Sequence, residues 1–195
     1  MADIVATVGA SGYDYTSLIT AESSEQATYG NLVGDGNTIT FQLFGTIDEG
    51  TSVCIISGWT TGSSNFITVT SGSGESHGGV IDGGAKLIAS NGSGATVQIQ
   101  QAYTKITDIQ ISCVDGPSGG RAIIIGNDFI ELTKCIITSA GSSALEVTNA
   151  FQDNSLFRNS LFLSSSNIVC NMVAIFTFEN CTVISANSGE NCIKR

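Results

Sequence analysis

The sequence predicts an all-β protein, a solenoid of short strands whose amino-terminal end is closed by a short helix. Composition is the first reason: of 195 residues, 42% are hydrophobic and only 12% charged, with 23 glycines and 1 proline. This balance is typical of a β-rich chain with many turns. The second reason is that short apolar or alternating runs, separated by Gly, Asn and Ser, fill the chain from Thr38 onward. The third is a strand template that recurs four times.

The chain is predicted to form one domain, residues 1–195. This length can bury one sizeable core, and no change of composition along the chain requires a second domain. Within the domain we expect residues 1–37 to form an amino-terminal cap segment and residues 38–195 to form the coils of the solenoid.

A short helix is predicted in the cap segment, in the stretch GYDYTSLITAESSEQATYGNLVGDGN. Its apolar positions are Leu18, Ile19 and Ala21. Asp14 or Thr16 would cap its amino-terminal end, and the helix would end by Gly30. Glu22 and Glu25 are expected on its solvent-facing side.

Strands are predicted from Thr38 onward, because apolar residues alternate with polar ones over short runs bounded by turn residues. In order, these runs are TITFQLFG, SVCIISG, NFITVTSG, KLIAS, TVQIQ, KITDIQISCV, RAIIIGN, FIELTKCIITSA, ALEVTN, LFRNSLFLSSS and IFTFENCTVIS.

Four of the later runs share one template of three inward-facing positions. The first positions are Ile106, Leu132, Phe157 and Phe178; the second are Ile109, Cys135, Ser160 and Cys181; the third are Ile111, Ile137, Phe162 and Val183. Successive first positions lie 26, 25 and 21 residues apart. A step of this size with two or three short strands is one turn of a solenoid, so equivalent side chains are expected to stack into ladders.

The same register predicts two outward-facing stacks. One contains Asp108, Lys134, Asn159 and Asn180, and the other contains Thr107, Thr133, Arg158 and Glu179. Asn159 and Asn180 would lie in a turn whose backbone amides a stacked Asn can satisfy. Arg158 and Glu179 would be neighbours on successive coils, as a surface ion pair rather than a catalytic pair.

The FRNS and FENC coils resemble those of the right-handed parallel β-helix family, the pectate-lyase-like solenoids, over roughly Thr38 to the carboxyl terminus. The segments YDYTSLITAE, GNLVGDGNTITF and TSVCIISGWTT resemble the cap and first coil of β-helix proteins common in phage-like genomes. The resemblance implies a right-handed, single-stranded solenoid. Its helix would cover the first coil, which otherwise exposes backbone groups and core.

Charge and cysteine content limit which kinds of partner and cofactor are expected. The net charge is -10, and residues 1–85 hold nine acidic residues and no Lys or Arg, which disfavours a nucleic-acid surface. The six cysteines form no metal-binding motif, so no metal or other cofactor is predicted and free, packed thiols are favoured over disulfides. We find no signal-peptide pattern and no apolar run that could cross a membrane.

The resemblance raises an enzymatic alternative, because many β-helices cleave acidic polysaccharides. Lyases of this family use Ca²⁺-binding carboxylates and an Arg or Lys base, whereas the hydrolases use clustered Asp residues, usually including an adjacent pair. This chain has no adjacent Asp pair. The candidate acids are Asp108, Asp128, Glu131, Glu146 and Glu179, and the cations of a glycan-binding coil face would be Lys105, Arg121, Lys134 and Arg158. We assign no catalytic residue, since so few cations make a site for an anionic polymer hard to assemble.

Two further residues, Trp59 and His77, are candidates for a site. Trp59 would either stack on a sugar, with help from Tyr13, Tyr15, Tyr29 or Tyr103, or bridge two strands at a coil corner. His77, the only histidine, lies in the Gly-rich loop GSGESHGGVIDGG and is predicted to be an ordinary loop residue.

The function predicted from these features is that of a non-enzymatic bacteriophage structural protein. The most concrete form is a capsid decoration or cement protein on the particle exterior, assembled in the host cytoplasm, with the major capsid protein, tail proteins or further copies of itself as partners. The alternatives are a tail spike or fibre component, and a short carbohydrate-active module that binds or cleaves a host surface glycan. These expectations rest on analogy between folds.

Overall fold

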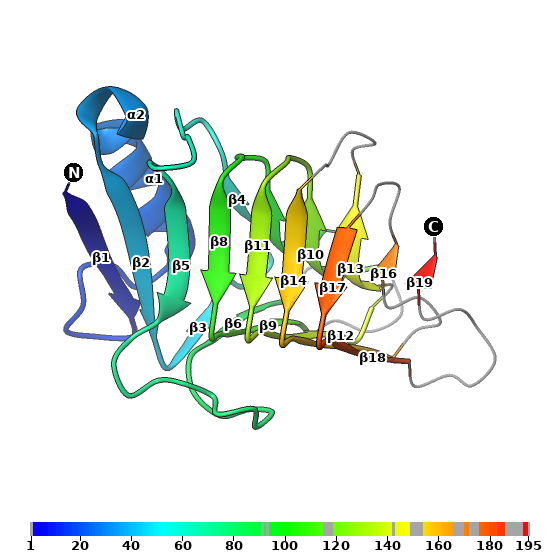
Figure 1. Cartoon of the computed structure of the whole chain (residues 1–195). Coiled ribbons are helices and arrows are strands. Elements are labelled where there is room, and N and C mark those ends of the chain that lie inside the picture. Colours follow the sequence, from blue (N-terminus) through cyan, green and yellow to red (C-terminus); the bar gives the residue numbers. More distant parts are fainter. Residues whose placement is uncertain are drawn as a thin grey trace.

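A computed structural model describes residues 2–90, 92, 94–114, 119–141, 143–148, 154–165, 170–171, 176–185 and 193–194. Over these residues the chain is mostly β-strand, with parallel sheets and two helices (Figure 1). The predicted dominance of short strands from Thr38 onward is confirmed.

The described strands form one seven-stranded and two six-stranded sheets, parallel throughout. The first sheet contains β1 (Asp3–Gly9), β2 (Thr38–Phe44), β5 (Ile67–Ser71), β8 (Thr104–Thr107), β11 (Ile130–Thr133), β14 (Ser155–Arg158) and β17 (Phe176–Glu179). The second contains β3 (Thr46–Asp48), β6 (Lys86–Ala89), β9 (Gln110–Cys113), β12 (Ile136–Ser139), β15 (Leu161–Ser164) and β18 (Thr182–Ser185). The third contains β4 (Cys54–Ile56), β7 (Ala95–Ile99), β10 (Arg121–Ile125), β13 (Ser143–Val147), β16 (Cys170–Asn171) and β19 (Ile193–Lys194).

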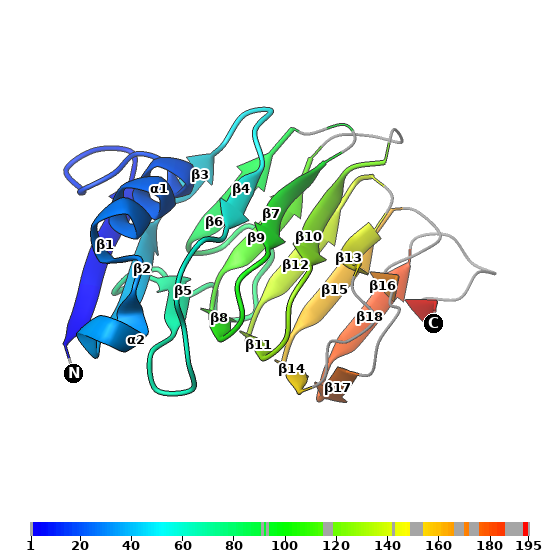
Figure 2. The same ribbon diagram turned by 90° about the horizontal axis from the view of Figure 1, so that it is seen from above.

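After β1 the chain passes through the three sheets in a fixed rotation. The strands β2, β3 and β4 lie in the first, second and third sheets, and every following set of three repeats this order up to β19. We call one such set a circuit. Each strand pairs with its equivalents in the neighbouring circuits, so the circuits lie side by side along the length of the molecule (Figure 2).

The predicted ladders are present in the predicted register. Leu132 pairs with Ile106 on one side and with Phe157 on the other, and Phe157 pairs with Phe178. The third positions pair in the same way, with Ile137 between Ile111 and Phe162. These side chains belong to one continuous hydrophobic core between the three sheets. Phe157 is fully buried and its ring contacts those of Phe162, Phe176 and Phe178.

The first predicted outward stack forms the turn between the first and second sheets, and we call it the turn column. Asp108, Lys134, Asn159 and Asn180 all have a left-handed backbone, with φ of 55°, 54°, 48° and 53°. Asn and Asp tolerate this conformation better than most residues, which explains why the turn shows in the sequence. The prediction that Asn side chains satisfy the backbone amides of this turn is wrong. The backbone N–H groups of Asp108, Lys134 and Asn159 donate to backbone carbonyls of the next circuit.

The amino-terminal segment differs from the prediction in containing a strand. β1 pairs with β2 from Asp3 to Gly9, and its Ala6 and Val8 are buried in the core. The segment 1–37 is therefore not only a cap, since its first residues extend the first sheet. The signal was the alternation of Ile4, Ala6 and Val8, a pattern that a half-buried strand requires.

The predicted helix is present as α1 (Leu18–Tyr29), followed by the short α2 (Leu32–Asp35). The residue that caps α1 is Ser17, whose hydroxyl accepts from the Thr20 N–H. Asp14 instead accepts hydrogen bonds from Thr7, and the end at Gly30 is as predicted. α1 packs against β1 and β4, beside the first circuit (Figure 1).

The solvent-facing position predicted for Glu22 is wrong. Glu22 is 8% exposed, and its carboxylate accepts hydrogen bonds from the Ser57 N–H and the Trp59 indole N–H. Burial of a carboxylate is tolerated where hydrogen bonds replace its water shell. Desolvation nevertheless raises the pKa of Glu22 above its ordinary value.

Candidate functional site

The four predicted cations do not share one face. Lys105 and Arg158 lie on the first sheet and Lys134 in the turn column, but Arg121 lies on β10 of the third sheet. The prediction of a single cationic glycan face is wrong in this respect, because the sequence separation of the cations places them on different sheets.

Three of these cations are also neutralised by carboxylates of the next circuit. Arg121 forms an ion pair with Glu146, the Arg158 Nε lies 2.7 Å from Glu179, and the Lys105 Nζ lies 3.9 Å from Glu131. The predicted pair of Arg158 and Glu179 is thus confirmed as a surface ion pair. Such pairs contribute little free energy, and they leave no concentrated positive charge for an anionic polymer. Lys134 is exposed and forms no ion pair within the described residues.

Trp59 cannot serve as a sugar platform, because it is 5% exposed. Its indole N–H donates to Glu22 at 3.0 Å, and its ring meets Phe41 edge to face. Of the two roles weighed for it, the structure therefore excludes stacking on a sugar. Trp59 instead joins α1 to the core of the first circuit.

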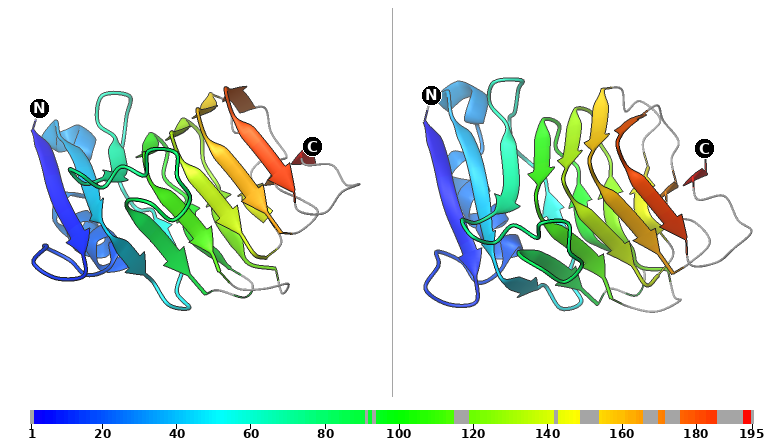
Figure 3. Two further views of the ribbon diagram at one scale, coloured as in Figure 1. Left: turned by 90° about the horizontal axis from the view of Figure 1, so that it is seen from below. Right: turned by 60° about the horizontal axis from the view of Figure 1, so that its bottom comes forward.

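His77 anchors the Gly-rich loop between β5 and β6, which runs along the outside of the sheets (Figure 3). Its Nε2–H donates to the Lys134 carbonyl at 2.7 Å, and its Nδ1 accepts from the Gly79 N–H at 2.9 Å. Asp108, which lies 3.6 Å from Nε2, accepts from the hydroxyls of Ser71 and Ser76. His77 therefore lies in a loop, as predicted, and its buried ring anchors that loop to the turn column.

The cysteines behave as core residues where the structure describes their side chains. Cys54, Cys135 and Cys181 are free thiols, and Cys113 is buried. Burial raises the pKa of Cys135 to about 12, which removes its nucleophilic character at neutral pH. No metal-binding group of His, Cys, Asp or Glu occurs among the described residues. Within that same part of the chain, no helix is long and apolar enough to span a bilayer.

A column of three aromatic residues and one asparagine marks where strands of the first sheet begin. Phe66, Tyr103, Phe129 and Asn154 directly precede β5, β8, β11 and β14, and strand pairing places them at equivalent positions. We call these four residues the start column. The rings of Tyr103 and Phe129 are stacked, with centroids 4.6 Å apart and planes 7° from parallel. Phe129 is 40% exposed.

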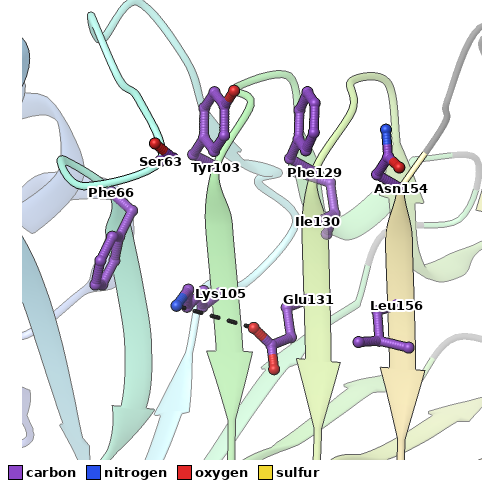
Figure 4. Close-up of a pocket in the computed structure, with 9 residues that line it drawn as sticks. All are labelled: Ser63, Phe66, Tyr103, Lys105, Phe129, Ile130, Glu131, Asn154 and Leu156. Carbon is purple, nitrogen blue, oxygen red and sulfur yellow. Dashed lines mark ion pairs between the residues drawn. The ribbon is translucent and has the colours of Figure 1, made fainter.

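The start column borders a shallow hollow of about 210 Å³ on the outer face of the first sheet (Figure 4). Tyr103, Phe129 and Asn154 stand in a row along one side, and Lys105, Glu131 and Leu156 form a parallel row along the strands (Figure 4). The Lys105 Nζ also lies 4.1 Å from the centre of the Phe66 ring, a favourable cation–π distance. Ser63 and Ile130 complete the lining.

The backbone of the start column is strained. Tyr103 and Phe129 have φ of 54° and 58°, in the left-handed region, where a residue other than Gly pays about 1–2 kcal/mol. A stacked aromatic pair returns only about 0.5–1.5 kcal/mol beyond its buried area. The stacking term alone therefore offsets only part of the backbone strain of the two residues.

The described lining of the hollow holds one carboxylate. This carboxylate is that of Glu131, whereas glycoside hydrolysis uses two carboxyl groups on opposite sides of the scissile bond. A second hollow, of about 340 Å³, lies beside the His77 loop and contains Asn159 and Asn180 but no carboxylate among its described lining residues. Neither hollow brings two carboxyl groups together among its described lining residues.

No family model matches the chain, and no curated protein or solved structure matches it either. The geometry of the site thus carries the functional argument. Sequence reasoning named Tyr103 only as a helper of Trp59 and missed Phe66 and Phe129. The available signal was the spacing, because Tyr103 and Phe129 lie 26 residues apart, as do Ile106 and Leu132.

Proposed function

We propose that the chain is a right-handed parallel β-helix and acts as a non-enzymatic structural protein of a bacteriophage particle. Its most concrete form is a capsid decoration or cement protein on the particle exterior, and a tail spike or fibre component is the nearest alternative. The observation that carries the proposal is the rotation of the chain through three parallel sheets with equivalent strands in register. Repeated circuits of this kind are typical of a solenoid.

Rigidity along the stack supports a structural role. The strands of neighbouring circuits are joined by backbone hydrogen bonds in all three sheets, and the core runs from β1 to the ring cluster around Phe157. The amino-terminal end is covered by α1, whose first turn is held by Glu49 of the first circuit. A rigid body with one covered end suits a protein that stands on a larger assembly.

The pairing of charges argues against an enzyme that cleaves an acidic polysaccharide. Such an enzyme needs cations or bound Ca²⁺ along its groove, but Lys105, Arg121 and Arg158 each face a carboxylate. Catalytic carboxyl groups would also have to face each other, and Glu131 lies alone among the described lining of its hollow. These features favour the non-enzymatic reading.

The charge distribution indicates how the protein would meet the particle. Residues 1–85 carry nine acids and no Lys or Arg, so the amino-terminal circuits either face solvent or contact a basic surface of the capsid protein. The carboxy-terminal circuits, with all seven cations and eight acids, are nearly neutral.

The test is to purify particles from the source lysate and measure by mass spectrometry whether the chain sediments with the major capsid protein. A ratio near that of the capsid protein supports decoration, and a few copies per particle support a tail component. Absence from particles, with the chain recovered only in the soluble fraction, would overturn the proposal.

A further inference from the structure

The aromatic pair of the start column is not required by the backbone that carries it. Asn154 holds the next position of the column with the same left-handed backbone, at φ 66°, and it has no ring. Bulky residues are outliers in this region, and such outliers gather at ligand-binding sites. Aromatic residues at two neighbouring positions of the start column, Tyr103 and Phe129, therefore indicate selection for contact with a ligand at this hollow.

The walls of the hollow combine apolar surface with a few polar groups. Phe66 and Leu156 lie at its two ends, and the stacked rings of Tyr103 and Phe129 stand between them (Figure 4). The Glu131 carboxylate and the Asn154 amide add hydrogen-bonding groups along the same hollow. Mostly apolar walls with few polar groups are the usual composition of a small-molecule site.

These groups match the surface of a sugar ring. A pyranose carries C–H groups on its faces and hydroxyls around its edge, so it can lie against aromatic and aliphatic side chains while its edge bonds to carboxylate, ammonium and amide groups. The volume of about 210 Å³ is below the roughly 300–1,000 Å³ of drug-sized sites. It therefore suits a single ring, and the open side leaves room for the rest of a chain.

The charge of the hollow selects against acidic sugars. Lys105 and Glu131 lie 3.9 Å apart and neutralise each other, and Lys105 also lies over the Phe66 ring. An incoming carboxylate would meet Glu131 as well as Lys105, and the chain as a whole carries a net charge of -10. Like charge disfavours binding.

We propose that this hollow binds one uncharged pyranose ring of a glycan, with the apolar C–H face of the sugar against Tyr103 and Phe129 and its hydroxyls on Glu131, Lys105 and Asn154. The site is independent of the proposed function, since the hollow belongs to the isolated chain. A proline-rich peptide is the rival ligand, because such peptides also bind aromatic grooves. The small volume of the hollow, about 210 Å³, favours the single ring.

The test is saturation-transfer NMR on the full chain with the methyl glycosides of glucose, galactose, mannose and N-acetylglucosamine, and with neutral oligosaccharides of the same sugars. At least one neutral sugar is expected to bind with a dissociation constant on the order of 1 mM, as its small size allows. Galacturonic acid and its oligomers are expected to bind at least ten-fold more weakly.

The variant that locates the site is Tyr103→Asn combined with Phe129→Asn, which places at both positions the residue that Asn154 already provides in the same backbone conformation. The fold is retained and sugar binding is expected to fall at least ten-fold. The matched control is Tyr13→Ala. Tyr13 is 41% exposed and stacks on Phe44, at the opposite end of the first-sheet strands, so its removal leaves sugar binding unchanged.

A second variant tests the charge argument. Glu131→Gln leaves Lys105 without its carboxylate, and the binding of galacturonic acid is expected to increase several-fold while neutral sugars still bind. The proposal is overturned if no neutral sugar in the panel binds at 20 mM (about twenty times the expected constant), or if the double Asn variant binds as the wild type does. Tighter binding of galacturonic acid or of a proline-rich decapeptide to the wild type would overturn it equally.

Discussion

Glu49 holds the first turn of α1 from the first circuit, and its removal gives the sharpest test of the amino-terminal cap. Glu49 is 8% exposed. One carboxylate oxygen accepts from the Leu18 N–H at 2.6 Å and the other from the Ser17 hydroxyl at 2.6 Å. The side chain thus satisfies a free amide of the helix terminus and places a negative charge at the positive end of the helix.

Glu49→Ala is expected to lower the free energy of unfolding by about 2–3 kcal/mol. A buried N–H left without a partner costs about 1–3 kcal/mol, and loss of the charge at the helix terminus adds about 0.3–1 kcal/mol. Glu49→Gln keeps an acceptor for the Leu18 N–H but loses the charge and the oxygen that accepts from the Ser17 hydroxyl. It is expected to cost about 1–2 kcal/mol, less than Glu49→Ala.

The assay is urea unfolding followed by far-ultraviolet circular dichroism, in which Glu49→Ala shifts the midpoint by about 1 M at a slope of about 2–3 kcal/mol per M. Hydrogen exchange would show faster exchange of the α1 amides in particular. Asp35→Ala is the control, because Asp35 is exposed on α2 and such changes usually stay within about 0.5 kcal/mol. A loss for Glu49→Ala no larger than that of the control would refute the reasoning.

Three further predictions concern the core. Burial raises the pKa of Glu22 above its ordinary value, so the protonated side chain stabilises the fold at low pH and this contribution is lost as pH rises through the raised pKa. The urea midpoint of Glu22→Gln should therefore increase relative to that of the wild type between pH 4 and pH 8. A difference between the two midpoints that stays constant with pH would contradict this. Burial raises the pKa of Cys135 to about 12, so its thiol should react with an aromatic disulfide reagent in the native protein more slowly than the partly exposed thiol of Cys181. Equal reaction rates of these two thiols would argue against the burial of Cys135. Phe157→Ala should lower the free energy of unfolding by about 3–5 kcal/mol, measured by urea unfolding, because the fully buried ring contacts three other phenylalanines; a loss below about 1 kcal/mol would contradict the packing.

The ladders could be predicted because equivalent positions of successive circuits face the same core and recur at a nearly fixed sequence separation. Leu132 and Phe157 face the same core as Ile106, so apolar side chains recur at their positions. Lengths of the connections and directions of individual side chains carry no such repetition. Glu22 was misplaced and the role of Trp59 stayed open for this reason, since their burial depends on how α1 packs on the first circuit.

The sequence analysis named the cations but did not predict the carboxylates that pair with Lys105 and Arg121. Arg121 and Glu146 lie 25 residues apart, and Lys105 and Glu131 lie 26 apart, which are the steps of the inward ladders. The rule that identified Arg158 and Glu179 as neighbours would have found both other pairs. Applied to all charged residues, it would have shown beforehand that Lys105, Arg121 and Arg158 each have a carboxylate partner on the next circuit.

The strained aromatic pair and the structural role fit together through copy number. A single ring bound with a constant on the order of 1 mM gives little occupancy at low glycan concentration. Many copies on one particle, facing a surface with repeated sugars, convert later contacts into intramolecular ones and raise the overall affinity by about 10²–10⁴-fold. When Tyr103 and Phe129 both become Asn, glycan-dependent adsorption of the particle should therefore decline far more steeply than glycan binding by the isolated chain. Equal declines would indicate that the sites act singly.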